Sequence, residues 1–168
     1  MQFELKKWSI SYKNDLIEAF KDAELVSELP DSYPFPFEET HAQYFLEQRL
    51  LNSEKKQICR AIVADNKVIG AVEVILGSGI YSRNGQLSVW ISKPYRRQGI
   101  ASEAVRQICD IAFNDYNAVR IAASVISHNR SAIAFMEHAG FVYEGTVHKG
   151  IYENDTLYDY CIYAIIRQ

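Results

Sequence analysis

Residues 89–104 place a basic, glycine-containing loop between an apolar strand pattern and a helix pattern. The first turn of a helix carries N–H groups without intrahelical partners and a partial positive charge, so it attracts anions. Gly99 and the small Ala101 let a phosphate approach the backbone, and Arg96 and Arg97 add charge-assisted donors. The pattern predicts a cradle for a pyrophosphate, although a solvated turn before a helix is the alternative. It lacks the Gly-Lys-Ser/Thr ending of a P-loop and the triple glycine of a dinucleotide fold.

A single carboxylate, Glu73, interrupts the apolar run of residues 71–75. Burying a carboxylate is costly without a partner or a purpose, which makes Glu73 the candidate base for proton transfer. The alternative is that Glu73 faces solvent on the outer side of its strand. Further candidates that the sequence does not rank are Tyr33, Tyr81, Tyr143, Tyr152 and Tyr158. Asp159 is either an alternative carboxylate or a charge on an edge strand.

Composition narrows the class of protein. The 168 residues, 48% of them hydrophobic, fit one folded domain spanning 1–168. The net charge of −3 argues against a nucleic-acid partner. No apolar run reaches the ~18 residues of a membrane span, and the first residues have no apolar signal segment. Three scattered cysteines and four histidines show no disulfide or metal-ligand spacing, so we expect buried thiols, a cytoplasmic protein and no metal.

The hydrophobic periodicity positions these residues on a mixed α/β framework with one βαβ crossover. Helices are predicted over residues 15–21, 38–50, 102–113 and 131–139, and strands over 58–64, 67–76, 85–91, 118–127, 143–152 and 157–167. Tight turns are expected at residues 65–66 and 153–155.

The spacing Arg96-x-x-Gly99-x-Ala101 resembles the Arg/Gln-x-x-Gly-x-Gly/Ala signature of the GNAT superfamily of acyl-CoA-dependent N-acetyltransferases. Residues 129–141 are similar to the family's second motif, Asn-x-x-Ala-Ile…Gly-Phe. The aromatic Pro-Phe-Pro-Phe loop at residues 34–37 most resembles the branch that acetylates ribosomal-protein N-termini and polyamines. The resemblance covers essentially the whole chain.

This resemblance implies a mostly antiparallel central sheet that splays between two parallel strands and is flanked by helices. It implies an N-acetyltransferase domain that uses acetyl-CoA as co-substrate, without a metal. A primary amine would attack the thioester directly in a ternary complex; the amine is a protein N-terminus, a polyamine or another small amine. The closing hairpin leaves a sheet edge that could pair in a homodimer.

The resemblance also assigns residues. The backbone of Val89, Trp90 and Ile91 would pair with the pantetheine arm, the N–H groups of residues 97–102 would hold the pyrophosphate, and Asn129 would bond the cofactor arm. The implied cofactor-binding set is Val89, Trp90, Ile91, Arg96, Arg97, Gln98, Gly99, Ile100, Ala101, Ser102 and Asn129. Two alternatives stay open: Asn129 caps the following helix, and the Trp90 side chain is a plain core aromatic.

The catalytic acid and base do not follow the family pattern. Met136 stands where many relatives carry a tyrosine, and Ala132 and Ile151 stand in place of the serine and glutamate of the ribosomal-protein branch. One alternative function is therefore a non-catalytic acyl-CoA-binding regulatory module. Another is a nucleotide-binding protein that uses the same anion cradle.

Overall fold

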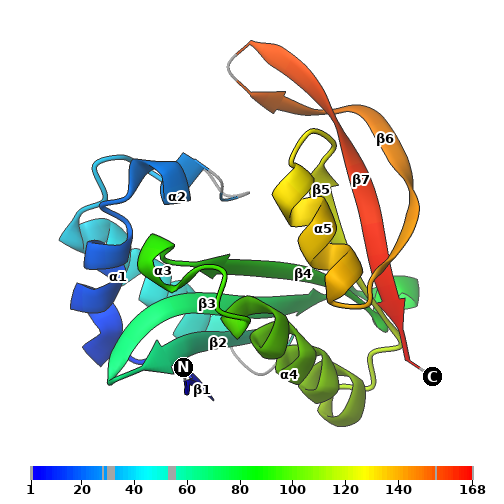
Figure 1. Ribbon diagram of the computed structural model, residues 1–168. Helices are drawn as coiled ribbons and strands as arrows, with labels where there is room; N and C mark the ends of the chain where they lie inside the picture. The colour runs from blue at the N-terminus through cyan, green and yellow to red at the C-terminus, as the bar shows by residue number, and fades with distance from the viewer. Residues whose placement is uncertain (1, 28, 30–32, 53–55, 154, 168) are drawn as a thin grey trace. The chain divides into compact units, whose positions relative to one another are not determined.

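The computed structural model describes residues 2–27, 29, 33–52, 56–153 and 155–167 (Figure 1). The strands are β1 (Glu4–Lys6), β2 (Gln57–Ala64), β3 (Lys67–Leu76), β4 (Asn84–Ile91), β5 (Arg120–Ile126), β6 (Val142–Glu153) and β7 (Thr156–Ile166). The helices are α1 (Lys13–Ala19), α2 (Ala23–Ser27), α3 (Glu39–Asn52), α4 (Ile100–Asp115) and α5 (Arg130–His138), with short 3₁₀ turns η1 (Ile10–Tyr12), η2 (Gly79–Tyr81) and η3 (Lys93–Tyr95).

The strands form one seven-stranded sheet in the order β1-β2-β3-β4-β5-β7-β6. The pairs β1–β2, β5–β7 and β6–β7 are antiparallel, whereas β4–β5 is parallel. The parallel register runs only from Asn84↔Arg120 to Gln86↔Ala122, although β4 continues to Ile91. The mostly antiparallel α/β sheet with one parallel pair confirms the expected fold class.

The expected helices and strands from residue 57 onward are present, with ends that move by a few residues. Asp65 and Asn66 have φ of 49° and 61°, as a two-residue type I′ hairpin turn requires. β1 and α2 were not predicted from the sequence, because three and five residues are too few to show a period. Part of the expected turn at residues 153–155 lies outside the described residues.

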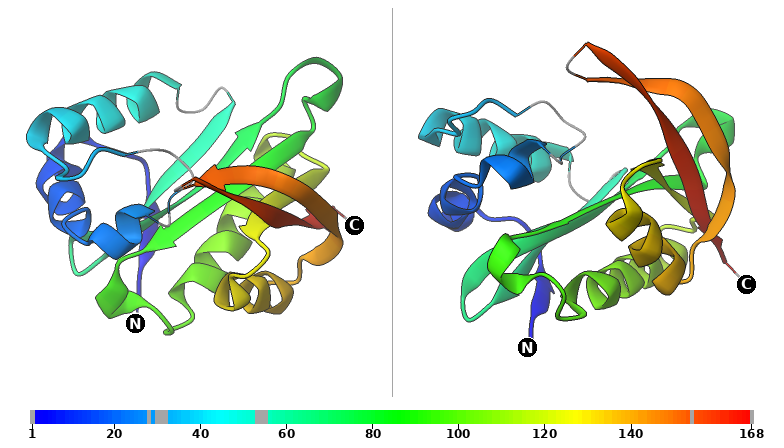
Figure 2. Two further views of the ribbon diagram at one scale, coloured as in Figure 1. Left: turned by 90° about the horizontal axis from the view of Figure 1, so that it is seen from above. Right: turned by 45° about the horizontal axis from the view of Figure 1, so that its top comes forward.

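The chain divides into two compact units, residues 1–74 with 88–108 and residues 75–87 with 109–168. The single domain expected over 1–168 stays a prediction. In the first unit, α1 and α3 cover one face of β2 and β3, and the start of α4 covers the other (Figure 2). In the second unit, β7 lies between β5 and β6 and pairs antiparallel with both, and α5 lies beside these strands.

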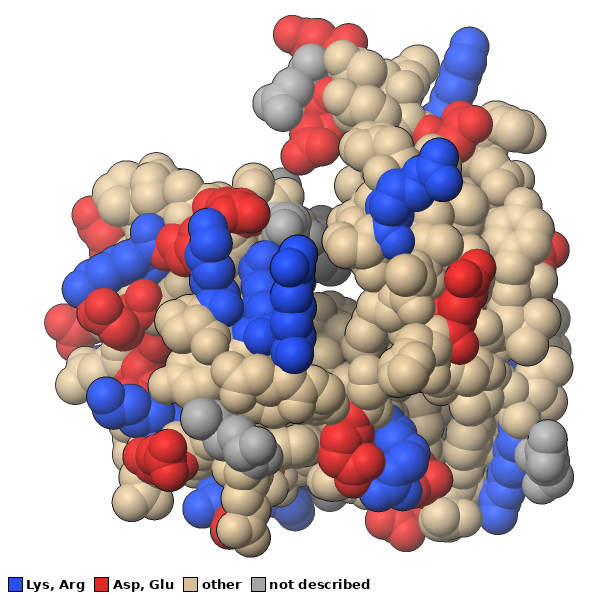
Figure 3. Space-filling model, viewed as in Figure 1, with Lys and Arg blue, Asp and Glu red and all other residues tan. Residues whose placement is uncertain are grey.

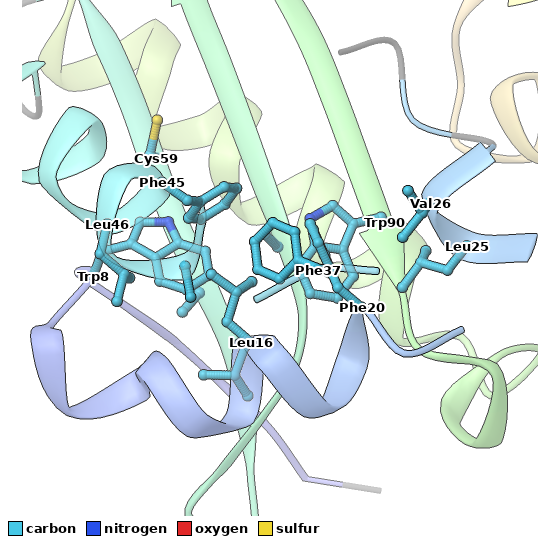
Figure 4. Close-up of a cluster of buried hydrophobic side chains, with 14 of the residues drawn as sticks. Trp8, Leu16, Phe20, Leu25, Val26, Phe37, Phe45, Leu46, Cys59 and Trp90 are labelled. Atoms are coloured by element: carbon cyan, nitrogen blue, oxygen red, sulfur yellow. The ribbon is translucent and has the colours of Figure 1, made fainter. Parts of the chain in front are cut away.

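The core of the first unit is built around Phe20, which is fully buried (Figure 4). Its ring makes edge-to-face contacts with Phe37 at 4.6 Å, with Trp90 at 5.3 Å and with Tyr33 at 5.3 Å between centroids. Such pairs contribute ~0.5–1.5 kcal/mol each beyond their buried area. This aromatic packing fixes β4 through Trp90 and brings the segment after α2 against it.

In the second unit, the β6–β7 hairpin is irregular between Val147 and Ile151. The Asp159 carboxylate bridges this bulge: it accepts the Lys149 N–H at 2.8 Å and lies 2.9 Å from His148 Nδ1. The Lys149 N–H first, and His148 second, lower the pKa of Asp159. Asp159, which the sequence analysis considered as a catalytic candidate, thus has a structural task in the hairpin.

Cys59, Cys109 and Cys161 are buried free thiols, which confirms their expected role as small core residues. Within the described ranges, no group of three or more His, Cys, Asp or Glu side chains is arranged to hold a metal ion. The helices of the described ranges are all too short or too polar to cross a membrane.

Candidate active site

The segment between β4 and α4 has the backbone of an anion cradle. The Ser92 N–H donates to Ile69 O at 2.8 Å, which ties the end of β4 to β3 before the chain turns. Arg97 and Gly99 both have positive φ, 62° and 77°. The first bond of α4 runs from the Glu103 N–H to Gly99 O at 3.1 Å, so helix geometry provides no acceptor for the N–H groups just before it.

The space and the charge at this segment fit a pyrophosphate. A Cβ built on Gly99 would meet no atom within 4 Å, so the loop is open on that side. Gln98 folds onto its own loop, since its Nε2 donates to Pro94 O at 3.1 Å. Arg97 is exposed, and Lys and Arg side chains gather over this segment (Figure 3).

The side chain of Arg96 does not simply face the expected phosphate position. Its Nε donates to Ile91 O at 3.0 Å, which clamps the loop to the last residue of β4. The side chain is half-buried rather than free in solvent. Arg96 therefore shapes the cradle, and the exposed Arg97 is the better placed of the two to reach an anion.

The β4 backbone expected to bind the pantetheine arm lies tightly against β3. A Cβ on Gly70 would approach Trp90 O to 2.4 Å and the Ile91 side chain to 2.7 Å. The Trp90 side chain is 9% exposed and belongs to the core cluster. The alternative of a core aromatic thus holds for its ring, and only its backbone stays a candidate for the cofactor.

Asn129 lies in the second unit, where it caps α5. Its Oδ1 accepts the Ala132 N–H at 3.0 Å and the Ser131 hydroxyl at 2.8 Å. The capping alternative is therefore realised. For the side-chain amide N–H₂ of Asn129, no acceptor is recorded among the described residues, and its contact with a cofactor stays a prediction.

Glu73 lies in a cavity of the first unit rather than on a solvent face. Its side chain is 17% exposed and its Oε2 lies 3.4 Å from Arg49 Nη2. The cavity has a volume of about 20 Å³, room for a group the size of one water molecule. Its lining comes from the segment after α2, from α3, β3 and β4: Leu29, Tyr33, Arg49, Ala71, Glu73, Ser88 and Trp90.

Arg49 is a charged residue of this cavity that was not predicted from the sequence. Its guanidinium carbon lies 3.5 Å over the ring of Phe45, one turn earlier on α3, which holds the charged group in place. Its Nη2 also lies 3.4 Å from the Tyr33 hydroxyl. The spacing of a phenylalanine and an arginine four residues apart was the only feature of the sequence that indicates this stacking. No feature of the sequence near Arg49 indicated that it pairs with Glu73.

Cys59 contacts the same carboxylate. Its thiol donates to Glu73 Oε2 at 3.1 Å. Burial, and then the neighbouring Glu73 charge, raise the pKa of Cys59 well above its usual range. The thiol is therefore a hydrogen-bond donor and not a nucleophilic thiolate.

The structure separates the tyrosine candidates. Tyr33 lines the cavity beside Arg49 and Glu73. Tyr81, Tyr143 and Tyr152 are each more than half exposed, and Tyr158 packs against His128 in the second unit. Met136, at the position where many relatives carry a tyrosine, is 6% exposed.

Comparison with known proteins identifies the family. A family described as an acetyltransferase (GNAT) domain matches residues 2–142. An uncharacterised SPbeta prophage-derived N-acetyltransferase, YokL of Bacillus subtilis (strain 168), is 26% identical over 140 residues, which cover 82% of this chain and 76% of YokL. The chain belongs to the GNAT acetyltransferase family.

Solved structures share the fold. The microcin C7 self-immunity acetyltransferase MccE, crystallised with acetyl-CoA and AMP, superposes with a TM-score of 0.87 at 19% identity, covering 99% of this chain and 93% of that one. RimL, a ribosomal L7/L12 α-N-protein acetyltransferase in complex with coenzyme A, gives 0.87 at 17% identity, covering 99% and 94%. At these identities the likeness concerns the fold alone.

Proposed function

We propose that the chain transfers an acetyl group from acetyl-CoA to a primary amine by direct attack in a ternary complex, with Glu73 as the proton acceptor. The observation that carries the proposal is the cavity of the first unit. It is lined by a carboxylate on the strand next to β4, together with Tyr33 and Trp90. Such a cavity admits a protein N-terminus or a small-molecule amine as the acceptor.

The residues of the cradle would hold the co-substrate. The first-turn N–H groups of α4 and the Arg97 guanidinium bind the pyrophosphate, and the β4 backbone at residues 89–91 pairs with the amide groups of the pantetheine arm. Acetyl-CoA supplies a thioester carbonyl, and a backbone N–H near Trp90 or Ile91 would stabilise the negative charge on its oxygen.

Proton transfer falls to Glu73. As the amine nitrogen bonds to the carbonyl carbon, its proton becomes acidic, and the carboxylate accepts it. The C–S bond then breaks and the sulfur leaves as a thiolate, which takes a proton from solvent because a free thiol has a pKa of about 8.5. Arg49 orients the carboxylate before the amine arrives.

Direct attack is favoured over a covalent acetyl-enzyme. Cys59, the thiol beside Glu73, is buried and donates its proton to that carboxylate. Burial raises its pKa, and the acetyl group would need a thiolate to attack it.

The test is Glu73→Gln, measured by release of free thiol from acetyl-CoA with a panel of primary amines. General-base loss typically lowers the rate ~10²–10⁴-fold, so we expect a fall in kcat of at least ~100-fold while KM for acetyl-CoA stays within about twofold. Glu144→Gln is the matched control, because Glu144 pairs with Arg120 in the second unit. A Glu73→Gln variant within about threefold of the wild type would contradict the role of Glu73.

A second outcome concerns the regulatory alternative, which the buried Met136 keeps open because it offers no acid. Binding of acetyl-CoA without turnover on any amine would favour a non-catalytic module. Incubation with acetyl-CoA alone, followed by intact-mass measurement, tests the direct attack: an acetylated enzyme would contradict it. The expected homodimer stays a prediction.

A further inference from the structure

The cavity beside β4 holds two opposite charges. Arg49 and Glu73 are 15% and 17% exposed, and they meet at 3.4 Å through one nitrogen and one oxygen. A tight carboxylate–guanidinium pair is shorter and uses two parallel bonds. This pair is long and single, so each group keeps capacity for a ligand.

Arg49 has donors to spare. Its hydrogen bonds with the described residues use only Nη2, toward Glu73 Oε2 and the Tyr33 hydroxyl, both at 3.4 Å. Within the described ranges, no acceptor is recorded for Nε or Nη1, and no side-chain nitrogen there is fully buried without a bond. The spare N–H groups therefore reach accessible space, and stacking on Phe45 fixes the plane in which they point. A guanidinium held in this way is suited to a carboxylate.

The net charge of the pair bears on the choice among amines. Arg49 cancels Glu73, so the cavity has no excess negative charge to draw in a polyamine, whose second ammonium would meet the guanidinium. A zwitterion fits the same pair head to tail, with its ammonium toward Glu73 and its carboxylate toward Arg49. The 3.4 Å between the two side chains suits an acceptor whose two groups share one carbon.

We propose that Arg49 is the specificity-determining residue of the acceptor cavity, and that it selects a small amine bearing a carboxylate, an α-amino acid, over polyamines and simple alkylamines. This inference rests on the proposed acetyl transfer to a primary amine. The small volume of the cavity, about 20 Å³, restricts the acceptor to a compact head group.

The experiment compares acceptors that differ only in the carboxylate. Alanine, alaninamide and ethylamine, with spermidine as the polyamine, are assayed by thiol release from acetyl-CoA with the wild type, Arg49→Gln and Arg49→Lys. For the wild type we expect kcat/KM, expressed per concentration of neutral amine, to be ~10–100-fold higher for alanine than for ethylamine and alaninamide, the range of one charge-assisted contact. Arg49→Gln should reduce this preference to less than threefold, and Arg49→Lys should restore part of it.

The ratio of kcat/KM for alanine to kcat/KM for ethylamine distinguishes a role of Arg49 in specificity from a role in folding. A purely structural role of Arg49 would lower the rate with every amine alike and leave the alanine-to-ethylamine ratio unchanged, which would overturn the inference. Arg120→Gln removes an arginine from another Arg–Glu pair, with Glu144, and should leave the ratio unchanged. Thermal melting shows that each variant is folded.

The two proposals fail differently. Turnover of ethylamine or spermidine at least as efficient as that of alanine overturns only the selection by Arg49. Equal rates with alanine and alaninamide also overturn it, because the site would then read a carbonyl and not a charge. No turnover with any amine, despite bound acetyl-CoA, refutes the acetyl transfer and this inference with it.

Discussion

Replacing Gly70 by alanine should disturb the strand that we expect to bind the pantetheine arm. A Cβ at residue 70 would lie 2.4 Å from Trp90 O and 2.7 Å from the Ile91 side chain. Ordinary van der Waals contact begins near 3.4 Å, so the Trp90 carbonyl would have to move by about 1 Å. The atom in the way belongs to the backbone of β4, and hydrogen bonds within the sheet hold this backbone in place.

The size of the effect follows from this overlap. Overpacking of this kind costs about 1–3 kcal/mol. For a chain of this length, each kcal/mol lowers Tm by about 2–4 °C, which predicts a loss of about 2–12 °C in Gly70→Ala. Displacing Trp90 and Ile91 should also weaken about one backbone hydrogen bond to acetyl-CoA, which corresponds to a ~3–10-fold higher KM.

Gly145→Ala provides the control. A Cβ at residue 145 would meet no atom within 4 Å, and Gly145 is not among the residues with positive φ. We expect its Tm to stay within about 2 °C of the wild type, as for an ordinary surface change. The assays are thermal melting by circular dichroism and initial rates against acetyl-CoA concentration. If Gly70→Ala melts with the wild type and keeps its KM, the close approach of β3 and β4 at Trp90 is wrong.

Two further predictions concern Asn129 and the buried thiols. Asn129→Ala should lose about 1 kcal/mol of stability, because the cap to Ala132 N–H disappears, whereas Asn129→Ser keeps a capping oxygen. Both variants should raise the KM for acetyl-CoA if the amide also forms a hydrogen bond with the cofactor. If KM is unchanged in both variants, Asn129 only caps the helix. Burial raises the pKa of Cys109 to about 12 and shifts that of Cys59 upward too. At pH 8 we therefore expect both to resist thiol reagents until the protein unfolds, as followed by peptide mass mapping, and labelling at equal rates in native and unfolded protein would contradict their burial.

Much of the anion cradle was predictable because it is local. Strand, loop and helix start follow one another within residues 89–104, and the capacity of a helix N-terminus to hold an anion depends on these neighbours alone. The two positive φ values fall at Gly99, as glycine favours, and at Arg97, which no propensity rule indicates. The bond from Arg96 to Ile91 O was not predictable either, since a side chain can fold back or extend from the same backbone.

The fold class followed from periodicity, with exceptions that have physical reasons. The I′ turn at Asp65-Asn66 and the strands on either side of it carry strong local signals. β1 and α2 carry almost none, because elements of three and five residues form only through contacts with the rest of the chain. The bulge near Lys149 likewise depends on a carboxylate ten residues away, Asp159.

The sequence by itself determined the family and the local backbone pattern of the predicted anion cradle, because both depend on residues that are neighbours along the chain. It named Glu73 but left open which way the side chain faces, since a strand residue points to either face depending on what packs there. Only the tertiary structure decided that Glu73 shares a cavity with Tyr33, and that Arg49 lies opposite it on a helix 24 residues earlier. Charges from separate elements interact only when packing removes the water between them, and that packing is a property of the whole core.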